Sequence, residues 1–191
     1  MSWIINSDYF TPLFDLRGKI EGLEGLDRKV MGFDFDRFVK DNVESNPPSS
    51  TDSILSYKDW LLFIEFKGGD DPPKDGSDED HKKSKSCGLK LKASDSVFIF
   101  DHFISMNWPN VPPKRCLIIV TSGGYNTIRS AVGNMANRKC YCPDFLNKYQ
   151  SKDVCEKRIF YDRVCWLSSK EFVRCINSRF PELLLINSQH M

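Results

Sequence analysis

The chain has 191 residues, of which 40% are hydrophobic and 28% are charged, and its formal net charge is +1. This length is enough for one domain with a sizeable apolar core. No apolar run approaches the length of a membrane span, which excludes an integral membrane protein, so we expect no membrane partner. The first residues lack the basic start and long apolar stretch of a secretory signal, which favours a cytoplasmic protein.

The small net charge hides an uneven distribution. Residues 1–69 carry 8 basic and 12 acidic side chains, whereas residues 87–191 carry 15 basic and 8 acidic side chains. A basic half can meet phosphate groups, which fits a protein that binds nucleic acid. Ordinary scatter of surface charges gives the same counts, so charge alone does not decide between these interpretations.

The 7 cysteines indicate reduced thiols, because their number is odd and no secretory signal is visible. Three of them stand among apolar residues and are expected in the core: Cys116, Cys165 and Cys175. Another three form the one cluster that hints at zinc, but their spacing matches no common zinc module: Cys140, Cys142 and Cys155.

The N-terminal third predicts turns followed by one helix. Residues 8–31 contain several glycines and are expected to form a helical or turn-rich cap, with Asp8 as a helix N-cap. Residues 33–43 predict an amphipathic helix with Asp34 as its N-cap and three apolar residues at helical spacing: Phe35, Phe38 and Val39. Residues 45–50 contain two prolines and predict a linker into the next element.

The next segment predicts a β-hairpin that carries charge. Residues 60–67 are apolar except for Glu65 and Lys67, which is typical of a buried strand. Because side chains alternate along a strand, both charged residues lie on one face. Residues 51–56 can form the partner strand, with residues 57–60 as a four-residue connection.

This loop length fixes the register of the hairpin. Ile54 then pairs with Phe63, and Asp52 lies opposite Glu65. Opposed residues have Cβ atoms roughly 4.5–5.5 Å apart, so two carboxylates placed there repel unless a cation lies between them. Carboxylate oxygens suit Mg²⁺ or Mn²⁺. The alternative is an amphipathic hairpin whose charged residues face solvent and have a purely structural role.

Asp52 followed by Glu65-Phe66-Lys67 resembles the active-site motif of the PD-(D/E)-x-K nuclease superfamily, which has the restriction-endonuclease-like fold. The resemblance implies that Asp52 and Glu65 bind Mg²⁺ or Mn²⁺, and that Lys67 positions or activates the attacking water. Thr51 stands directly before Asp52, where the motif name has proline, and that proline is often missing in relatives.

The same resemblance points to positions outside the hairpin. Many members of the superfamily carry a further acid on a helix before the hairpin, and four residues here compete for that role: Asp34, Asp36, Asp41 and Glu44. Some relatives place a lysine or glutamine near the metal on the helix that follows. Lys90 and Lys92 fall in that region, and surface lysines are the favoured interpretation.

The chain after Lys67 changes composition abruptly. Residues 70–86 are charged, include His81 and contain nothing apolar to bury, so they predict a mobile loop. Residues 89–106 then predict a helix packed on the sheet, with His102 on its surface or half buried. Its apolar stripe consists of five residues: Leu89, Ala93, Val97, Phe100 and Ile104.

The C-terminal part predicts two more strands and a helix. Residues 115–121 are apolar throughout, as in a central strand with parallel neighbours. Residues 162–167 predict a short strand, and residues 168–171 fit a capping box that starts a helix. That helix is expected to run to about Arg179 and to end at Pro181.

The order of these elements predicts an α/β fold, a restriction-endonuclease-like mixed β-sheet flanked by helices. We expect residues 1–191 to form a single nuclease-like domain. Its catalytic core would span residues 33–122, with residues 123–191 as a C-terminal extension of the same domain.

The leading functional hypothesis is a metal-dependent nuclease that hydrolyses phosphodiester bonds of DNA or RNA. Asp52, Glu65 and Lys67 would be catalytic, with Asp52 and Glu65 holding Mg²⁺ or Mn²⁺. The alternative is a catalytically inactive nuclease-like fold that binds nucleic acid or protein. Basic and aromatic residues between positions 126 and 150 could grip a nucleic-acid strand. The oligomeric state stays open, a homodimer included.

Overall fold

The computed structural model describes residues 5–17, 20–68, 89, 91–108, 111–112, 114–122 and 160–187. Within this part of the chain, six strands form one mixed sheet in the order β1-β2-β3-β4-β5-β6. The strands are β1 (Phe10–Pro12), β2 (Met31–Asp34), β3 (Ser53–Tyr57), β4 (Trp60–Lys67), β5 (Lys114–Thr121) and β6 (Arg163–Ser168). Spatial order therefore follows chain order across the whole sheet.

The direction of the strands changes at β4. The neighbours from β1 to β4 pair antiparallel, whereas β4, β5 and β6 pair parallel. Parallel neighbours need a crossover connection, and the one from β4 to β5 contains a helix at residues 91–99. This helix continues as η3 (Phe100–Ile104) and η4 (Ser105–Asn107). As predicted, β5 is a central strand between two parallel neighbours.

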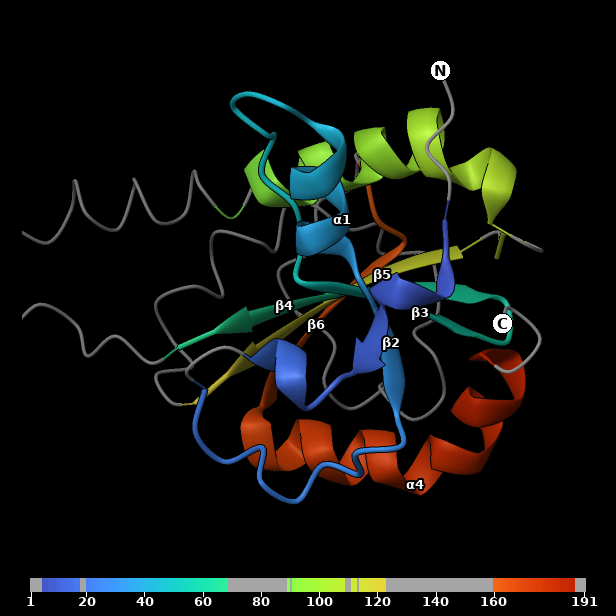
Figure 1. Ribbon diagram of the computed structural model, residues 1–191. Helices are drawn as coiled ribbons and strands as arrows, with labels where there is room; N and C mark the ends of the chain where they lie inside the picture. Colours follow the sequence, from blue (N-terminus) through green and yellow to red (C-terminus); the bar gives the residue numbers. More distant parts are fainter. Residues whose placement is uncertain are drawn as a thin grey trace, which may run out of the picture.

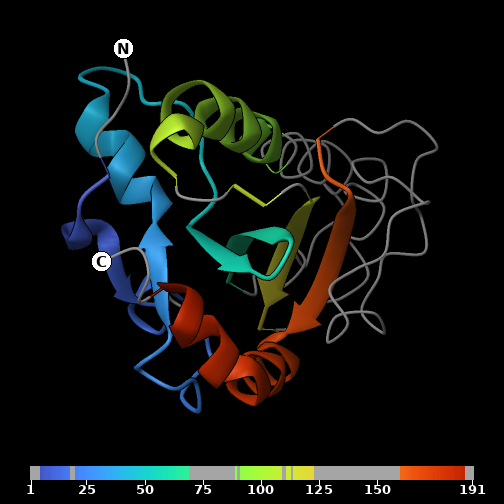
Figure 2. The ribbon, with the colours of Figure 1, turned by 90° about the vertical axis from the view of Figure 1, so that its right-hand side faces the viewer.

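Helices cover both faces of the sheet (Figures 1 and 2). One face carries α1 (Phe35–Asn42) and the helix at residues 91–107, and the opposite face carries α4 (Ser169–Asn187). The fold is thus α/β with a mixed sheet flanked by helices, which confirms the prediction at that level. No helix in the described ranges is both long and apolar enough to cross a lipid bilayer.

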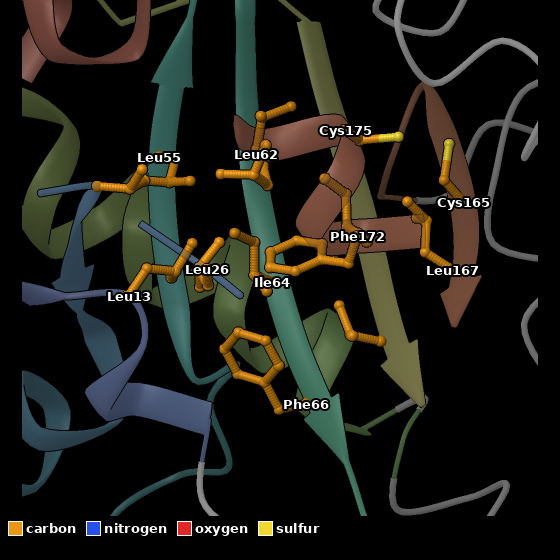
Figure 3. Close-up of a cluster of buried hydrophobic side chains, with 14 of the residues drawn as sticks. Leu13, Leu26, Leu55, Leu62, Ile64, Phe66, Cys165, Leu167, Phe172 and Cys175 are labelled. Atoms are coloured by element: carbon orange, nitrogen blue, oxygen red, sulfur yellow. The ribbon is translucent and has the colours of Figure 1, made fainter. Parts of the chain in front are cut away.

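Each face of the sheet has its own hydrophobic core, because side chains alternate along the strands. In β4, Leu61 and Phe63 belong to the core under α1 and the helix at residues 91–107. Leu62, Ile64 and Phe66 belong to the core under α4. Figure 3 shows this second core, in which the rings of Phe66 and Phe172 meet edge to face at 5.6 Å. The three predicted core cysteines, Cys116, Cys165 and Cys175, are also buried there.

The two helices on the first face form as their sequences predict. The side chain of Asp34 accepts a hydrogen bond from the backbone N–H of Arg37 (3.1 Å) and so caps α1. The complete predicted stripe is buried, with Leu89 before the helix at residues 91–107 and four residues within it: Ala93, Val97, Phe100 and Ile104. His102 lies on its exposed side, in agreement with the surface placement expected for it.

Two side-chain hydrogen bonds fasten this helix to β3 and to Thr51, two residues before it. Near its start, Ser96 Oγ accepts from the backbone N–H of Thr51 (2.8 Å). At its end, the indole N–H of Trp108 donates to Ser56 Oγ (3.1 Å). Both bonds are buried, so they set how far along β3 the helix lies.

The N-terminal segment departs from the predicted cap. It does contain turns, η1 (Ser7–Tyr9) and η2 (Asp15–Arg17), but the unpredicted strand β1 lies between them. Three residues are too few to show alternation, and Pro12 fits an edge strand because it needs no partner for an N–H. Strand β2 is also unpredicted, since its residues 31–34 fall where the sequence predicts the end of the cap and the start of the helix. The N-cap is Asn6 rather than Asp8, since Asn6 Oδ1 accepts from the N–H of Asp8 (3.0 Å).

The C-terminal helix begins as predicted and ends later. The N–H of Ser168 donates to Glu171 Oε2 (2.9 Å), and the N–H of Glu171 lies 3.3 Å from Ser168 Oγ, which confirms the capping box. However, α4 continues to Asn187, so the expectation that Pro181 ends it is wrong. A proline removes one helical hydrogen bond and often bends a helix, and helix packing can outweigh that loss.

Candidate active site

The hairpin of β3 and β4 has the predicted register. Ile54 pairs with Phe63 as expected, and the ladder runs from Ser53 opposite Ile64 to its closed end. The connection consists of residues 58–59, so the predicted four-residue connection is wrong. The two flanking residues pair with each other, which adds a rung at the end of the hairpin without shifting any other pair.

Asp52 directly precedes β3, one position beyond the last pair of the ladder. Its Oδ2 accepts a hydrogen bond from the backbone N–H of Phe66 (2.6 Å). This bond holds the carboxylate of Asp52 against the Glu65–Phe66 peptide at the far end of β4. The two acids that the sequence placed together are therefore neighbours.

Glu65 is the most deeply buried acid of this group. Its side chain lies on the same face of β4 as Leu61 and Phe63, and the residue is 0% exposed. A carboxylate at such a site is costly unless cations or hydrogen bonds compensate its charge. Lys67 supplies one cation, because its Nζ lies 2.7 Å from Glu65 Oε1. About a third of the Lys67 side chain (34%) is exposed, so this ammonium lies where the site opens to solvent.

The second cation comes from Lys92, in the first turns of the helix that follows β4. Its Nζ lies 3.0 Å from Glu65 Oε1, 3.3 Å from Glu65 Oε2 and 4.0 Å from Asp52 Oδ1. The expectation of a simple surface lysine is wrong for this residue. A signal was present in the sequence, since Lys92 directly precedes the buried Ala93 and so borders the apolar stripe.

These charges affect one another strongly. Burial raises the pKa of the Asp52 carboxyl from 3.8 to about 7, and the negative charge of Glu65 adds to the rise. The charges of Lys92 and Lys67 and the hydrogen bond from Phe66 act in the opposite direction. Burial lowers the pKa of Lys92, but the charges of Glu65 and Asp52 outweigh it, so the pKa of Lys92 is raised. An acid with a perturbed pKa beside a specific charge partner is typical of functional sites.

Of the four upstream acids, Asp36 acts electrostatically on Lys92. Its negative charge contributes to the raised pKa of Lys92, and its carboxylate contacts Ser50 and Lys40. The other three have different surroundings: Asp34 caps α1, Asp41 accepts from the hydroxyl of Tyr9, and Glu44 is exposed. Asp36 thus has an electrostatic link to the site.

The donor set fits a hard divalent cation in its chemistry, because it offers two neighbouring carboxylates. The ammonium of Lys92 contacts both of them, at 3.0 Å from Glu65 Oε1 and 4.0 Å from Asp52 Oδ1. In the described part of the chain, no group of three or more His, Cys, Asp or Glu side chains is arranged to hold a metal. Asp52 and Glu65 would therefore have to bind it with water or substrate oxygens.

Several predicted features lie outside the described residues: the loop at 70–86 with His81, Lys90, the region 126–150, and the cysteines at 140, 142 and 155.

Comparisons with family models, curated proteins and solved structures found no match to this chain. The geometry of the four charged residues is consequently the main basis for a functional argument.

Proposed function

We propose that the chain is a metal-dependent nuclease that hydrolyses phosphodiester bonds of DNA or RNA, of the PD-(D/E)-x-K type. One observation carries the proposal: Asp52 and Glu65 lie side by side at the end of a buried hairpin, with Lys67 2.7 Å from Glu65 Oε1. The order of the elements supports it too, because a helix and a parallel strand follow the strand that carries Glu65.

Each residue has a distinct role in this proposal. Asp52 and Glu65 would hold Mg²⁺ or Mn²⁺, which when bound supplies Lewis acidity and lowers the pKa of water. The hydrogen bond from the N–H of Phe66 keeps the Asp52 carboxylate in place for binding. The partly exposed ammonium of Lys67 can orient water and stabilise the negative charge that develops on the phosphate oxygens.

The proposal is tested by incubating the chain with plasmid, linear duplex DNA, single-stranded DNA and RNA, each with Mg²⁺ or Mn²⁺. We expect cleavage that falls by about 100-fold or more in Glu65→Gln, Asp52→Asn and Lys67→Met, because such groups typically contribute 10²–10⁴-fold. Asp59→Asn is the matched control, since Asp59 is an exposed acid in the hairpin turn.

Circular dichroism shows whether each variant remains folded. Cleavage that survives unchanged in a folded Glu65→Gln variant would refute the proposed site. Such a result would also assign the observed cleavage to another group or to a contaminant.

A second candidate function is a nuclease-like module that binds nucleic acid or protein without cutting. The observation that favours it is the presence of two lysines at the two acids, because this arrangement balances the buried charges without a metal. This candidate predicts nucleic-acid binding that persists in a chelating buffer and in Lys67→Met. Fluorescence anisotropy with labelled DNA and RNA oligonucleotides measures that binding directly.

A further inference from the structure

The ammonium of Lys92 lies where a cation shared by the two acids would lie. It is within 3.3 Å of both oxygens of Glu65 and 4.0 Å from Asp52 Oδ1. The Glu65 side chain is only 1% exposed, and its Oε1 also contacts the ammonium of Lys67 at 2.7 Å. A cation that bridges Asp52 and Glu65 therefore meets Lys92, whose ammonium contacts both acids.

The backbone of Lys92 is held at this place by a relay of hydrogen bonds. The N–H of Thr51 donates to Ser96 Oγ (2.8 Å), and the hydroxyl of Ser96 donates to the carbonyl oxygen of Lys92 (2.6 Å). Ser96 is 0% exposed. One buried side chain thus connects Lys92 with the residue that precedes Asp52. The position of the ammonium follows from how the helix is fastened and does not arise from a chance surface contact.

The side chain of Lys92 nevertheless has a way out. It is 27% exposed, whereas the Glu65 side chain that it contacts is almost fully covered. A lysine has a flexible four-carbon stem, so its ammonium can move into water while its backbone stays in place. Because the backbone is held and the side chain is partly exposed, the ammonium of Lys92 can lie either at the two carboxylates or in solvent.

Charge balance implies that a metal and the ammonium of Lys92 do not occupy the place between the carboxylates at the same time. In their charged forms, Asp52 and Glu65 carry two negative charges, and Lys67 and Lys92 carry two positive charges. A Mg²⁺ ion binds carboxylate oxygens at about 2.1 Å, which is closer than the ammonium to the same atoms. Two cations on the same oxygens repel each other, and the repulsion is strong where water is largely excluded. The metal and the ammonium of Lys92 therefore compete for one place.

We propose that Lys92 is an internal competitor for the divalent metal. Its ammonium holds the carboxylates of Asp52 and Glu65 together in the metal-free protein, and a divalent cation binds only as it displaces that ammonium toward solvent. The inference rests on the proposed function, because it takes those two acids as the metal ligands. It assigns to Lys92 the control of metal affinity, a role distinct from that of Lys67.

Calorimetric titration of the full chain with Mn²⁺ tests this directly. We expect Lys92→Met to bind Mn²⁺ about tenfold or more tightly than the wild type, because the variant removes the competing charge and keeps the apolar stem. Lys114→Met is the matched control: it removes the same charge from an exposed pair with Asp59, and its affinity for Mn²⁺ should change by less than about twofold. Adding Glu65→Gln to Lys92→Met should abolish the tightened binding.

A second measurement does not depend on a variant's affinity. Lysine side-chain NMR of the wild type should show the Lys92 ammonium as a signal that exchanges slowly with water, and Lys92→Met identifies this signal by its loss. Saturation with Mg²⁺ should remove the slow exchange, because the ammonium moves into solvent. Lys92→Gln replaces Lys92→Met in both measurements if the latter does not fold.

The outcomes separate this inference from the function on which it rests. If wild type and Lys92→Met bind Mn²⁺ equally through Glu65, the competitor role is refuted and the metal site stands. The same holds if the slow ammonium signal survives saturation with Mg²⁺. If Lys92→Met binds Mn²⁺ and the wild type does not, the competitor role is supported. That result also favours the second candidate function, a module that binds without cutting. If neither protein binds Mn²⁺ at millimolar concentration, both the metal site and the inference fail.

Discussion

Replacing Asp52 by asparagine should change how the stability of the metal-free protein depends on pH. In the folded protein the pKa of Asp52 is raised to about 7, against 3.8 for an unperturbed aspartate. Between these values the folded chain keeps a proton that the unfolded chain has released. The free energy of unfolding of the wild type therefore falls as pH rises through this window. Asparagine has no proton to lose, so Asp52→Asn lacks this contribution.

The size of the effect follows from the same shift. One pKa unit corresponds to about 1.4 kcal/mol, so a rise from 3.8 to about 7 corresponds to roughly 4 kcal/mol. About a quarter of the Asp52 side chain (24%) is exposed, and water reduces the effect. We therefore expect Asp52→Asn to gain about 2–4 kcal/mol relative to the wild type between pH 4.5 and pH 8. Asparagine can still accept the hydrogen bond from the N–H of Phe66.

Urea denaturation in a chelating buffer at several pH values measures this difference. The difference between the free energies of unfolding of the two proteins at each pH cancels the titration of the groups that they share. Asp59→Asn is the control, because an exposed ion pair such as that of Asp59 with Lys114 contributes little, and its pH profile should follow the wild type. Parallel profiles of the wild type and Asp52→Asn would refute the argument that burial and Glu65 oppose the ionisation of Asp52.

Two further variants test how the fold supports the site, both by urea denaturation. Glu171→Ala removes the acceptor for the N–H of Ser168 and should cost about 1 kcal/mol, whereas Ala at the exposed Lys170 should cost less than about 0.5 kcal/mol. Equal losses would contradict the capping role. Tyr161→Phe removes a buried hydrogen bond to the carbonyl oxygen of Ala93 (2.9 Å) and should cost about 1–2 kcal/mol. An unchanged unfolding midpoint would show that this bond does not stabilise the packing of the helix against Tyr161, two residues before β6.

The hairpin was predictable because its information is local. Alternation placed Glu65 and Lys67 on one face, and pairing counted from the turn placed Asp52 beside them. The error in the connecting turn left the register intact, because it added a pair at the closed end only. Local signals also predicted α1 and the start of α4, where Asp34 and Glu171 form the caps that their sequences suggest.

The remaining parts depend on tertiary packing, which a single sequence does not display. Lys92 reaches Glu65 because its helix is fastened to β3, and no spacing within residues 89–106 shows that contact. The electrostatic link between Asp36 and Lys92 depends in the same way on where α1 lies over the sheet. Strand β1 is too short to have a pattern of its own, and its pairing with β2 defines it.

The two fasteners between β3 and the helix at residues 91–107 have a consequence for how this site tolerates change. Thr51 lies two residues before β3, and Ser56 lies within it. Ser96 lies in the first part of the helix, and Trp108 directly follows η4. The two hydrogen bonds therefore hold the helix at two separate points, one against the residue before Asp52 and one within β3. A change that disturbs β3 should consequently move Lys92 relative to Glu65, even where β4 itself is unchanged.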